Sequence, residues 1–219
     1  MLKEKVDEYY LKKRKARERK SFYVTDVAEC PRVVYFSFKN FPKKEHEPRI
    51  LRVMHNGDFV HQRMGNVLTE MKVLEPANTE IPIPENDLFR GRADAIIEIE
   101  GEKYVVDFKS ANTYTFRSLQ APKPEHIKQV QLYMHYLGIK KGLLFYECKN
   151  TQDIKEFPVD YDVNIVNEII QEFYLLKSKI ENNIVPDIPA WIEQWKCERC
   201  PFLESCKKIG NPYFKNTED

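Results

Sequence analysis

The chain has 219 residues, the length of one domain or of one domain with a small appendage. Since 42% are hydrophobic and 12% aromatic, it can bury a core and is not disordered along its length. Its 35 basic and 34 acidic residues leave a net charge of +1, which indicates no class of partner. No run approaches the roughly 20 apolar residues of a membrane span, so we expect no such span. The first residues are charged and do not form a secretory signal, so we expect an intracellular protein. The seven glycines form no phosphate-binding loop, which argues against a P-loop.

The first 20 residues form a predicted basic arm. They contain nine lysines and arginines and four acids, which gives 9 − 4 = +5 and leaves 1 − 5 = −4 for the rest of the chain. We expect a charged helix over residues 3–20, with Thr25 and Asp26 as cap candidates before a short helix. Cations neutralise phosphates, and Tyr9 and Tyr10 can stack on unpaired bases, so this arm suits DNA binding. The alternative is a solvated helix with salt bridges.

Helices and strands alternate along the rest of the chain. Apolar residues spaced three and four apart predict a helix over 49–72, and His61 lies within this apolar stripe and should face the interior. We expect strands at 79–83, 89–98, 103–109, 143–148 and 155–159, helices at 125–137 and 162–182, and an irregular loop over 110–123. The order α-β-β-β-α-β indicates an α/β fold with a mixed central sheet flanked by helices.

Two aspartates are predicted to meet across a hairpin. The Glu100-Gly101 turn sets a register in which paired residues sum to 201, so Asp94 faces Asp107 with Cβ atoms about 5 Å apart. Like charges at that separation repel, and a divalent cation can hold them together, because Mg²⁺ and Mn²⁺ prefer carboxylate oxygens. Lys109 lies two residues further on, on the same face of the strand.

Two carboxylates and a lysine on one face suit phosphodiester cleavage. A metal held by Asp94 and Asp107 lowers the pKa of a bound water and polarises the phosphate. Lys109 can then orient or deprotonate that water and offset phosphate charge. The alternative is a hairpin that carries solvated surface residues, since D-x-K tripeptides are common.

The motif Gly91-x-x-Asp94 followed by Asp107-x-Lys109 resembles the PD-(D/E)XK nuclease superfamily. The resemblance extends over about residues 25–208 and is strongest to the RecB-like, CRISPR-associated exonuclease family that carries a Cys₄ iron–sulfur cluster. It implies a restriction-endonuclease-like core. Asp107 departs from the glutamate of many members.

The resemblance also assigns roles to further residues. His61 on the preceding helix is similar to the histidine that completes the metal shell in the RecB-like branch, and the Phe108 carbonyl is implied as another ligand. Gln129 and Tyr133 match a Q-x-x-x-Y motif and, four residues apart, share one helix face on which they can contact the DNA backbone. The alternatives are a core histidine and an ordinary helix flank.

Cys197, Cys200 and Cys206 have the spacing of metal ligands. Cys30 and Cys148 are candidates for the fourth thiolate, and Cys148 is better explained as a small buried hydrophobe in an apolar strand. Cys30 matches the lone N-terminal cysteine of the similar family. Four cysteines suit zinc or iron–sulfur, and the resemblance favours a 4Fe-4S cluster, with 2Fe-2S, zinc and free thiols as alternatives.

The sequence thus predicts a basic arm (1–20), a RecB-like nuclease core (21–185) and a C-terminal iron–sulfur segment (186–219) completed by Cys30. The resemblance implies a cytoplasmic Mg²⁺- or Mn²⁺-dependent exonuclease on single-stranded DNA, or on DNA with single-stranded ends, of 5′ to 3′ polarity, which trims DNA beside a CRISPR integrase. The alternatives are a viral or repair nuclease, a non-catalytic DNA-binding module and a zinc-stapled interaction protein. We expect the loop after the catalytic strand to guide a single strand through Tyr114, Phe116, Arg117 and Lys123.

Overall fold

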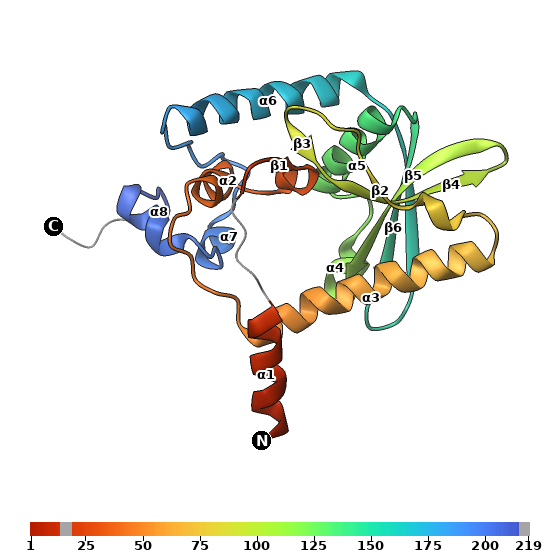
Figure 1. Ribbon diagram of the computed structural model, residues 1–219, viewed down its shortest axis with the longest axis horizontal. Helices are drawn as coiled ribbons and strands as arrows, with labels where there is room; N and C mark the ends of the chain where they lie inside the picture. Colours follow the sequence, from red (N-terminus) through yellow and green to blue (C-terminus); the bar gives the residue numbers. More distant parts are fainter. Residues whose placement is uncertain (14–18, 215–219) are drawn as a thin grey trace. The chain divides into compact units, whose positions relative to one another are not determined.

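The computed structural model describes residues 1–13 and 19–214 (Figure 1). Its elements, in chain order, are α1 (Leu2–Lys13), β1 (Phe22–Tyr23), the 3₁₀ helix η1 (Val24–Ala28), α2 (Pro31–Phe38), α3 (Pro48–Glu70), the 3₁₀ helix η2 (Pro76–Asn78), β2 (Thr79–Pro82), β3 (Phe89–Arg90), β4 (Arg92–Ile99), β5 (Glu102–Ala111), α4 (Thr113–Ser118), α5 (Pro124–Leu137), β6 (Lys141–Cys148), β7 (Ile154–Asp160), α6 (Val163–Glu181), α7 (Gln194–Glu198) and α8 (Leu203–Ile209). Among the helices of these ranges, none has the length and apolar character of a membrane span.

The chain divides into two compact units. The sheet unit consists of Tyr23–Ala28 and Met54–Ile170, and the terminal unit combines Met1–Phe22, Glu29–Val53 and Gln171–Asp219. The terminal unit therefore brings the N-terminal segments together with the cysteine-rich C-terminal segment.

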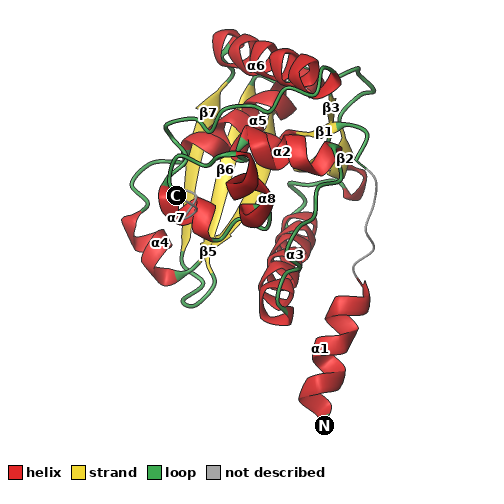
Figure 2. Cartoon of the chain, turned by 90° about the vertical axis from the view of Figure 1, so that its left-hand side faces the viewer, coloured by secondary structure: helices red, strands yellow, loops and turns green. Residues whose placement is uncertain are grey.

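The sheet unit is built on a five-stranded mixed sheet of order β2-β4-β5-β6-β7. Strands β5 and β6 are parallel and the other neighbours are antiparallel, and β5, β6 and β7 run side by side in Figure 2. Val105, Val106 and Leu144 on the two parallel strands are buried, as expected of strands covered on both faces. This confirms the predicted mixed α/β fold.

Helices α3 and α5 lie on opposite faces of this sheet (Figure 1). Val60 and Met64 of α3 pack on Val106 and its neighbours on one face. On the other face, a Cβ atom at Gly142 would lie 3.0 Å from Val130 of α5, so the absent side chain lets α5 approach the sheet closely. The two helices thereby cover both faces of the sheet around Val105 and Val106 of β5.

The N-terminal prediction was wrong in two respects. Helix α1 ends at Lys13, residues 14–18 lie outside the described residues, and Arg19 and Lys20 are not helical. Thr25 and Asp26 do not cap a helix but lie inside η1, where Asp26 accepts a hydrogen bond from the Tyr23 amide at 2.7 Å. Helix α2 begins later because Pro31 has the fixed φ of a first helical residue.

Two further differences lie beside the catalytic hairpin predicted above. The expected loop 110–123 contains helix α4, which is capped by Asn112, whose side chain accepts a hydrogen bond from the Thr115 amide at 2.9 Å. The expected strand 89–98 is interrupted at Gly91, where a Cβ atom would lie 2.8 Å from a methyl group of Val24. Only glycine fits that close approach, so Gly91 of the motif has a packing role.

Candidate active site

The β4–β5 hairpin has the predicted register. Its pairs run from Ala95↔Val106 to Ile99↔Glu102 and each sums to 201. Glu100 and Gly101 have φ values of 53° and 81°, as a two-residue hairpin turn requires. The regular pairing ends one step before Asp94 and Asp107.

Asp94 lies where this pairing ends. Its Oδ2 accepts a hydrogen bond from the Phe108 amide at 2.7 Å, so the side chain binds the backbone of the neighbouring strand. Its Oδ1 lies 3.4 Å from Nδ1 of His61 on α3. Asp94 therefore links the hairpin to the helix that covers it.

Asp107 is the buried carboxylate of the site, with only 1% of its surface exposed. The Lys109 ammonium lies 2.7 Å from Oδ2, and Gln129 donates a hydrogen bond to Oδ1 at 3.2 Å. Burial raises the pKa of Asp107 to about 6, Lys109 opposes this shift, and Asp94 adds to it. Oδ2 accepts no hydrogen bond of regular geometry from the described residues, so this buried oxygen could bind a cation.

Gln129 bridges Asp107 and Lys109. Its Oε1 accepts a hydrogen bond from Lys109 at 2.9 Å, and its Nε2 lies 3.5 Å from the hydroxyl of Tyr133, one helical turn further along α5. Both α5 side chains are buried, and burial raises the pKa of Tyr133, which keeps its hydroxyl protonated. The predicted motif residues thus lie together with Asp107 and Lys109, on the α5 face of the sheet.

His61 lies at the edge of the interior rather than fully within it, with 33% of its side chain exposed. Burial disfavours the charged imidazole, but the Asp94 carboxylate outweighs this effect and raises the pKa of His61. A histidine that contacts a carboxylate differs from the core histidine, hydrogen-bonded to backbone, that the sequence left as an alternative.

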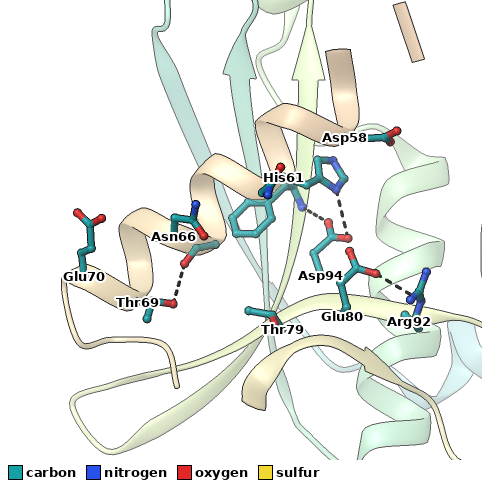
Figure 3. A pocket seen from close by; sticks show the side chains of 12 residues that line it. Asp58, His61, Asn66, Thr69, Glu70, Thr79, Glu80, Arg92 and Asp94 are labelled. Atoms are coloured by element: carbon teal, nitrogen blue, oxygen red, sulfur yellow. Dashed lines mark hydrogen bonds and ion pairs between the residues drawn. The ribbon is translucent and has the colours of Figure 1, made fainter. Parts of the chain in front are cut away.

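A cavity of about 870 Å³ opens beside Asp94, between α3, β2 and β4 (Figure 3). This acidic cavity is lined by Asp58, His61, Gln62, Gly65, Asn66, Thr69, Glu70, Thr79, Glu80, Arg92, Asp94 and Phe108. Four carboxylates and one arginine give its walls a formal charge of 1 − 4 = −3. Asp107, which is buried, and Lys109, whose side chain is 19% exposed, are not among the lining residues.

Glu80 was missed by the sequence analysis. The pairs Thr79↔Ala95 and Ile81↔Ala93 on either side place Glu80 opposite Asp94 in the register of β2 and β4. Its carboxylate lies 3.3 Å from Arg92, and its backbone has a positive φ of 51°. No short turn links β2 to β4, so this pairing could not be derived from the sequence.

The side chains of the site, as they are placed, fit a divalent metal ion only in part. The described residues contain no group of three His, Cys, Asp or Glu side chains placed to hold a metal ion as they stand. The donor set of Asp94, Asp107 and His61 nevertheless fits a divalent cation, because one buried oxygen of Asp107 has only the Lys109 ammonium beside it. A small side-chain movement that displaces Lys109 would free that oxygen.

Four of the five cysteines lie in the terminal unit. Cys30 caps helix α2, and Cys197, Cys200 and Cys206 lie on or next to α7 and α8. Burial raises the pKa of Cys200 to about 11, and the charges of the other three add to this shift, so the four thiols are neighbours. Cys148 is buried in the sheet unit instead.

The sulfur of Cys206 also has polar support. Arg32 and Asn211 each place a side-chain N–H 3.4 Å from it. Such N–H···S contacts stabilise thiolates and tune iron–sulfur centres, so this environment suits a metal-bound sulfur. Arg32 also donates to the Pro186 and Gly210 carbonyls, which ties α2 to the C-terminal segment within the terminal unit.

Comparisons with known proteins match nearly the whole chain to nucleases. A family model described as the PD-(D/E)XK nuclease superfamily matches residues 11–207. The CRISPR-associated exonuclease Cas4 of Saccharolobus solfataricus is 25% identical over 217 residues, which is 94% of this chain and 95% of that protein. The solved structure of SSO0001 has a TM-score of 0.62 at 21% identity, covering 99% of this chain and 98% of that one. The alkaline exonuclease LHK-Exo of Laribacter hongkongensis has a TM-score of 0.52 at 19% identity, covering 81% and 94%.

The buried charge of Asp107 predicts a characteristic pH dependence of stability. Its pKa rises from 3.8 to about 6 on folding, so the folded carboxyl holds its proton more tightly and wild-type protein loses stability as the pH rises from about 4 to about 6. Asp107→Asn removes this loss. Without metal, the variant should be more stable than wild type by about 3 kcal/mol near pH 7, and the gap should shrink towards pH 4.

Denaturant unfolding in EDTA across this pH range measures both free energies. Wild-type and variant curves that stay parallel from pH 4 to pH 7 would contradict the raised pKa.

Proposed function

Since the chain belongs to the PD-(D/E)XK nuclease superfamily, we propose that it is a divalent-metal-dependent deoxyribonuclease whose reaction takes place at Asp94, Asp107 and Lys109. The observation that carries this proposal is the buried Asp107 carboxylate, whose two oxygens contact Lys109 and Gln129, together with the Asp94–His61 contact on the same hairpin. A surface hairpin with solvated acids would have no such set of buried contacts.

The metal would be held by Asp94, Asp107 and His61, with the Phe108 carbonyl as a further ligand. Bound Mg²⁺ or Mn²⁺ supplies charge that polarises the phosphate and lowers the pKa of water. The Asp94 carboxylate is oriented for this by the Phe108 amide, and the Lys109 ammonium would be released from Asp107 to offset phosphate charge and orient the attacking water.

Gln129 and Tyr133 would act mainly through Lys109. We infer this from their burial, since side chains of α5 that are buried against the sheet cannot reach a long stretch of DNA backbone. The Gln129 amide accepts from Lys109 and donates to Asp107, which fixes the distance between acid and base. The resemblance implies that Gln129 and Tyr133 contact the DNA backbone. For this, the DNA would have to approach the two side chains from the acidic cavity.

Single-stranded DNA, or DNA with single-stranded ends, is the proposed substrate, degraded from 5′ to 3′. Support comes from the resemblance, from the relative named as an exonuclease and from fold neighbours that are named exonucleases. Tyr114 on α4 is 86% exposed and can stack on a base, whereas Phe116 is buried and cannot guide DNA as the sequence suggested.

The proposed pathway is the processing of captured DNA inside the cell during CRISPR spacer acquisition, beside the integrase. The relative named as a CRISPR-associated exonuclease supports this choice, because the similarity spans nearly the whole of both chains. A viral or repair nuclease would use the same chemistry.

We also propose that Cys30, Cys197, Cys200 and Cys206 hold a 4Fe-4S cluster that joins the N- and C-terminal segments. Their location in one unit, their mutual effect on pKa and the N–H groups directed at Cys206 support this proposal. Such a cluster closes a long loop and so constrains the unfolded chain.

Nuclease activity tests the assignment of the site directly. With a labelled single-stranded oligonucleotide and Mn²⁺, Asp94→Asn and Lys109→Met should each lower the cleavage rate at least a hundredfold, on the order of the loss of a key charged group. Lys103→Ala removes an exposed cation from the same hairpin and should keep the wild-type rate. Thermal melting of each variant shows whether it is folded.

Equal cleavage by all four proteins would remove the proposed site. Equal DNA binding with no cleavage by any of them would indicate the non-catalytic DNA-binding module instead.

The cluster has a separate test. Cys197→Ala should yield colourless protein with a lower melting temperature, because three thiolates cannot complete a Cys₄ site. Cys148→Ala, in the other unit, should keep the colour. Visible absorbance with iron and sulfide analysis of anaerobically purified protein measures this. Colourless wild-type protein that contains zinc would contradict the iron–sulfur assignment.

A further inference from the structure

We propose that a second cavity, next to the acidic one, binds one nucleotide of a single-stranded substrate, with Phe59 stacking on the base and Lys149 contacting a phosphate. The inference rests on the proposed function, since it names where the strand lies beside the scissile phosphate. It concerns residues for which the sequence analysis gave no role.

This adjoining cavity has a volume of about 420 Å³, within the roughly 300–1,000 Å³ range of small-ligand sites. It is lined by Asn56, Phe59, Val60, Gln62, Arg63, Asn66, Glu147, Lys149 and Gln152. Gln62 and Asn66 of α3 are exposed and line both cavities, so the two cavities lie on either side of these side chains. A strand with its reacting phosphate in the acidic cavity would pass over Gln62 and Asn66 to reach the adjoining one.

Phe59 supplies the stacking surface. It is 56% exposed although it is a large aromatic, and the His55 ring lies beside it with the two centroids 4.6 Å apart. Bases stack on exposed aromatic side chains regardless of sequence, because every base has a π-face. The ring stands on α3, the helix that also carries His61, so its distance from the proposed metal site is fixed by the helix.

The charge of the two cavities differs in sign. In the adjoining cavity Arg63 donates to both oxygens of Glu147, at 2.5 and 2.6 Å, and so neutralises a carboxylate that is 1% exposed. Lys149 makes no ion pair within the described part of the chain, which leaves the walls at 2 − 1 = +1, against −3 in the acidic cavity. A metal ion therefore favours the acidic cavity and a phosphate favours the adjoining one.

The remaining walls can read or hold a base edge. Asn56, Gln62, Asn66 and Gln152 are amides, and each offers both donors and acceptors. The Gln152 carbonyl already accepts from Arg63 at 3.3 Å, so the ion pair also fixes one of these amides. Aromatic, cation and amides around one cavity fit a nucleotide better than an apolar peptide.

The test is the binding of a fluorescein-labelled 20-nucleotide oligothymidylate by full-length protein in EDTA, where no hydrolysis takes place. Phe59→Ala should weaken binding by about fivefold to a hundredfold, the range of one lost base–aromatic stack. Lys149→Ala should weaken binding and reduce the slope of log affinity against log salt by about 0.7, the value for one phosphate on a single strand. Ile99→Ala and Lys103→Ala, on the hairpin away from the cavity, are the matched controls.

Phe59 and Lys149 variants that bind the oligonucleotide as the controls do would overturn the proposal, provided that they melt like wild type. An equal loss of affinity for a blunt duplex of the same length would overturn the single-strand assignment. Because binding is measured without metal, a wild-type protein that cleaves no DNA would defeat the proposed function while the comparison of affinities still decides on the cavity.

Discussion

The negative charge of Asp107 within the central strand is the constraint on which the rest of the site depends. A carboxylate that is almost fully buried between two covered sheet faces carries a large desolvation cost, and its raised pKa reflects that cost. Lys109 and Gln129 offset part of it, and apart from the Lys109 ammonium at 2.7 Å, Oδ2 has no hydrogen-bond donor among the described residues. The strand would be more stable without the charge, and this cost supports the proposal that the site binds a cation.

The surrounding structure separates charges in a way that fits this role. Carboxylates from α3, β2 and β4 collect in the acidic cavity, while the next cavity along α3 has a neutralised Glu147 and an unpaired Lys149 within the described residues. Helix α3 contributes side chains to both cavities. The sheet, covered on both faces, therefore fixes the positions of the buried carboxylates. Helix α3 carries the surface side chains of both cavities, along which a substrate strand would lie.

The parts of the site that could be predicted from the sequence are those fixed by local rules. The Glu100-Gly101 turn determines the hairpin register. From this register and the alternation of side chains, the sequence predicted that Asp94 and Asp107 lie near each other. Helix spacing likewise placed Gln129 and Tyr133 on one face. Glu80 and the Arg63–Glu147 pair escaped prediction because they depend on contacts between segments far apart in the chain. Helix α4 was missed although Asn112 was a visible cap residue, since the segment after it has no apolar periodicity.

A crystal of the protein soaked in Mn²⁺, with data collected at an anomalous wavelength for manganese, tests the central claim most directly. The account predicts one strong anomalous peak within about 2.2 Å of carboxylate oxygens from both Asp94 and Asp107, with the Lys109 ammonium moved away from Oδ2. No peak there, at a manganese concentration that supports DNA cleavage in solution, would contradict it.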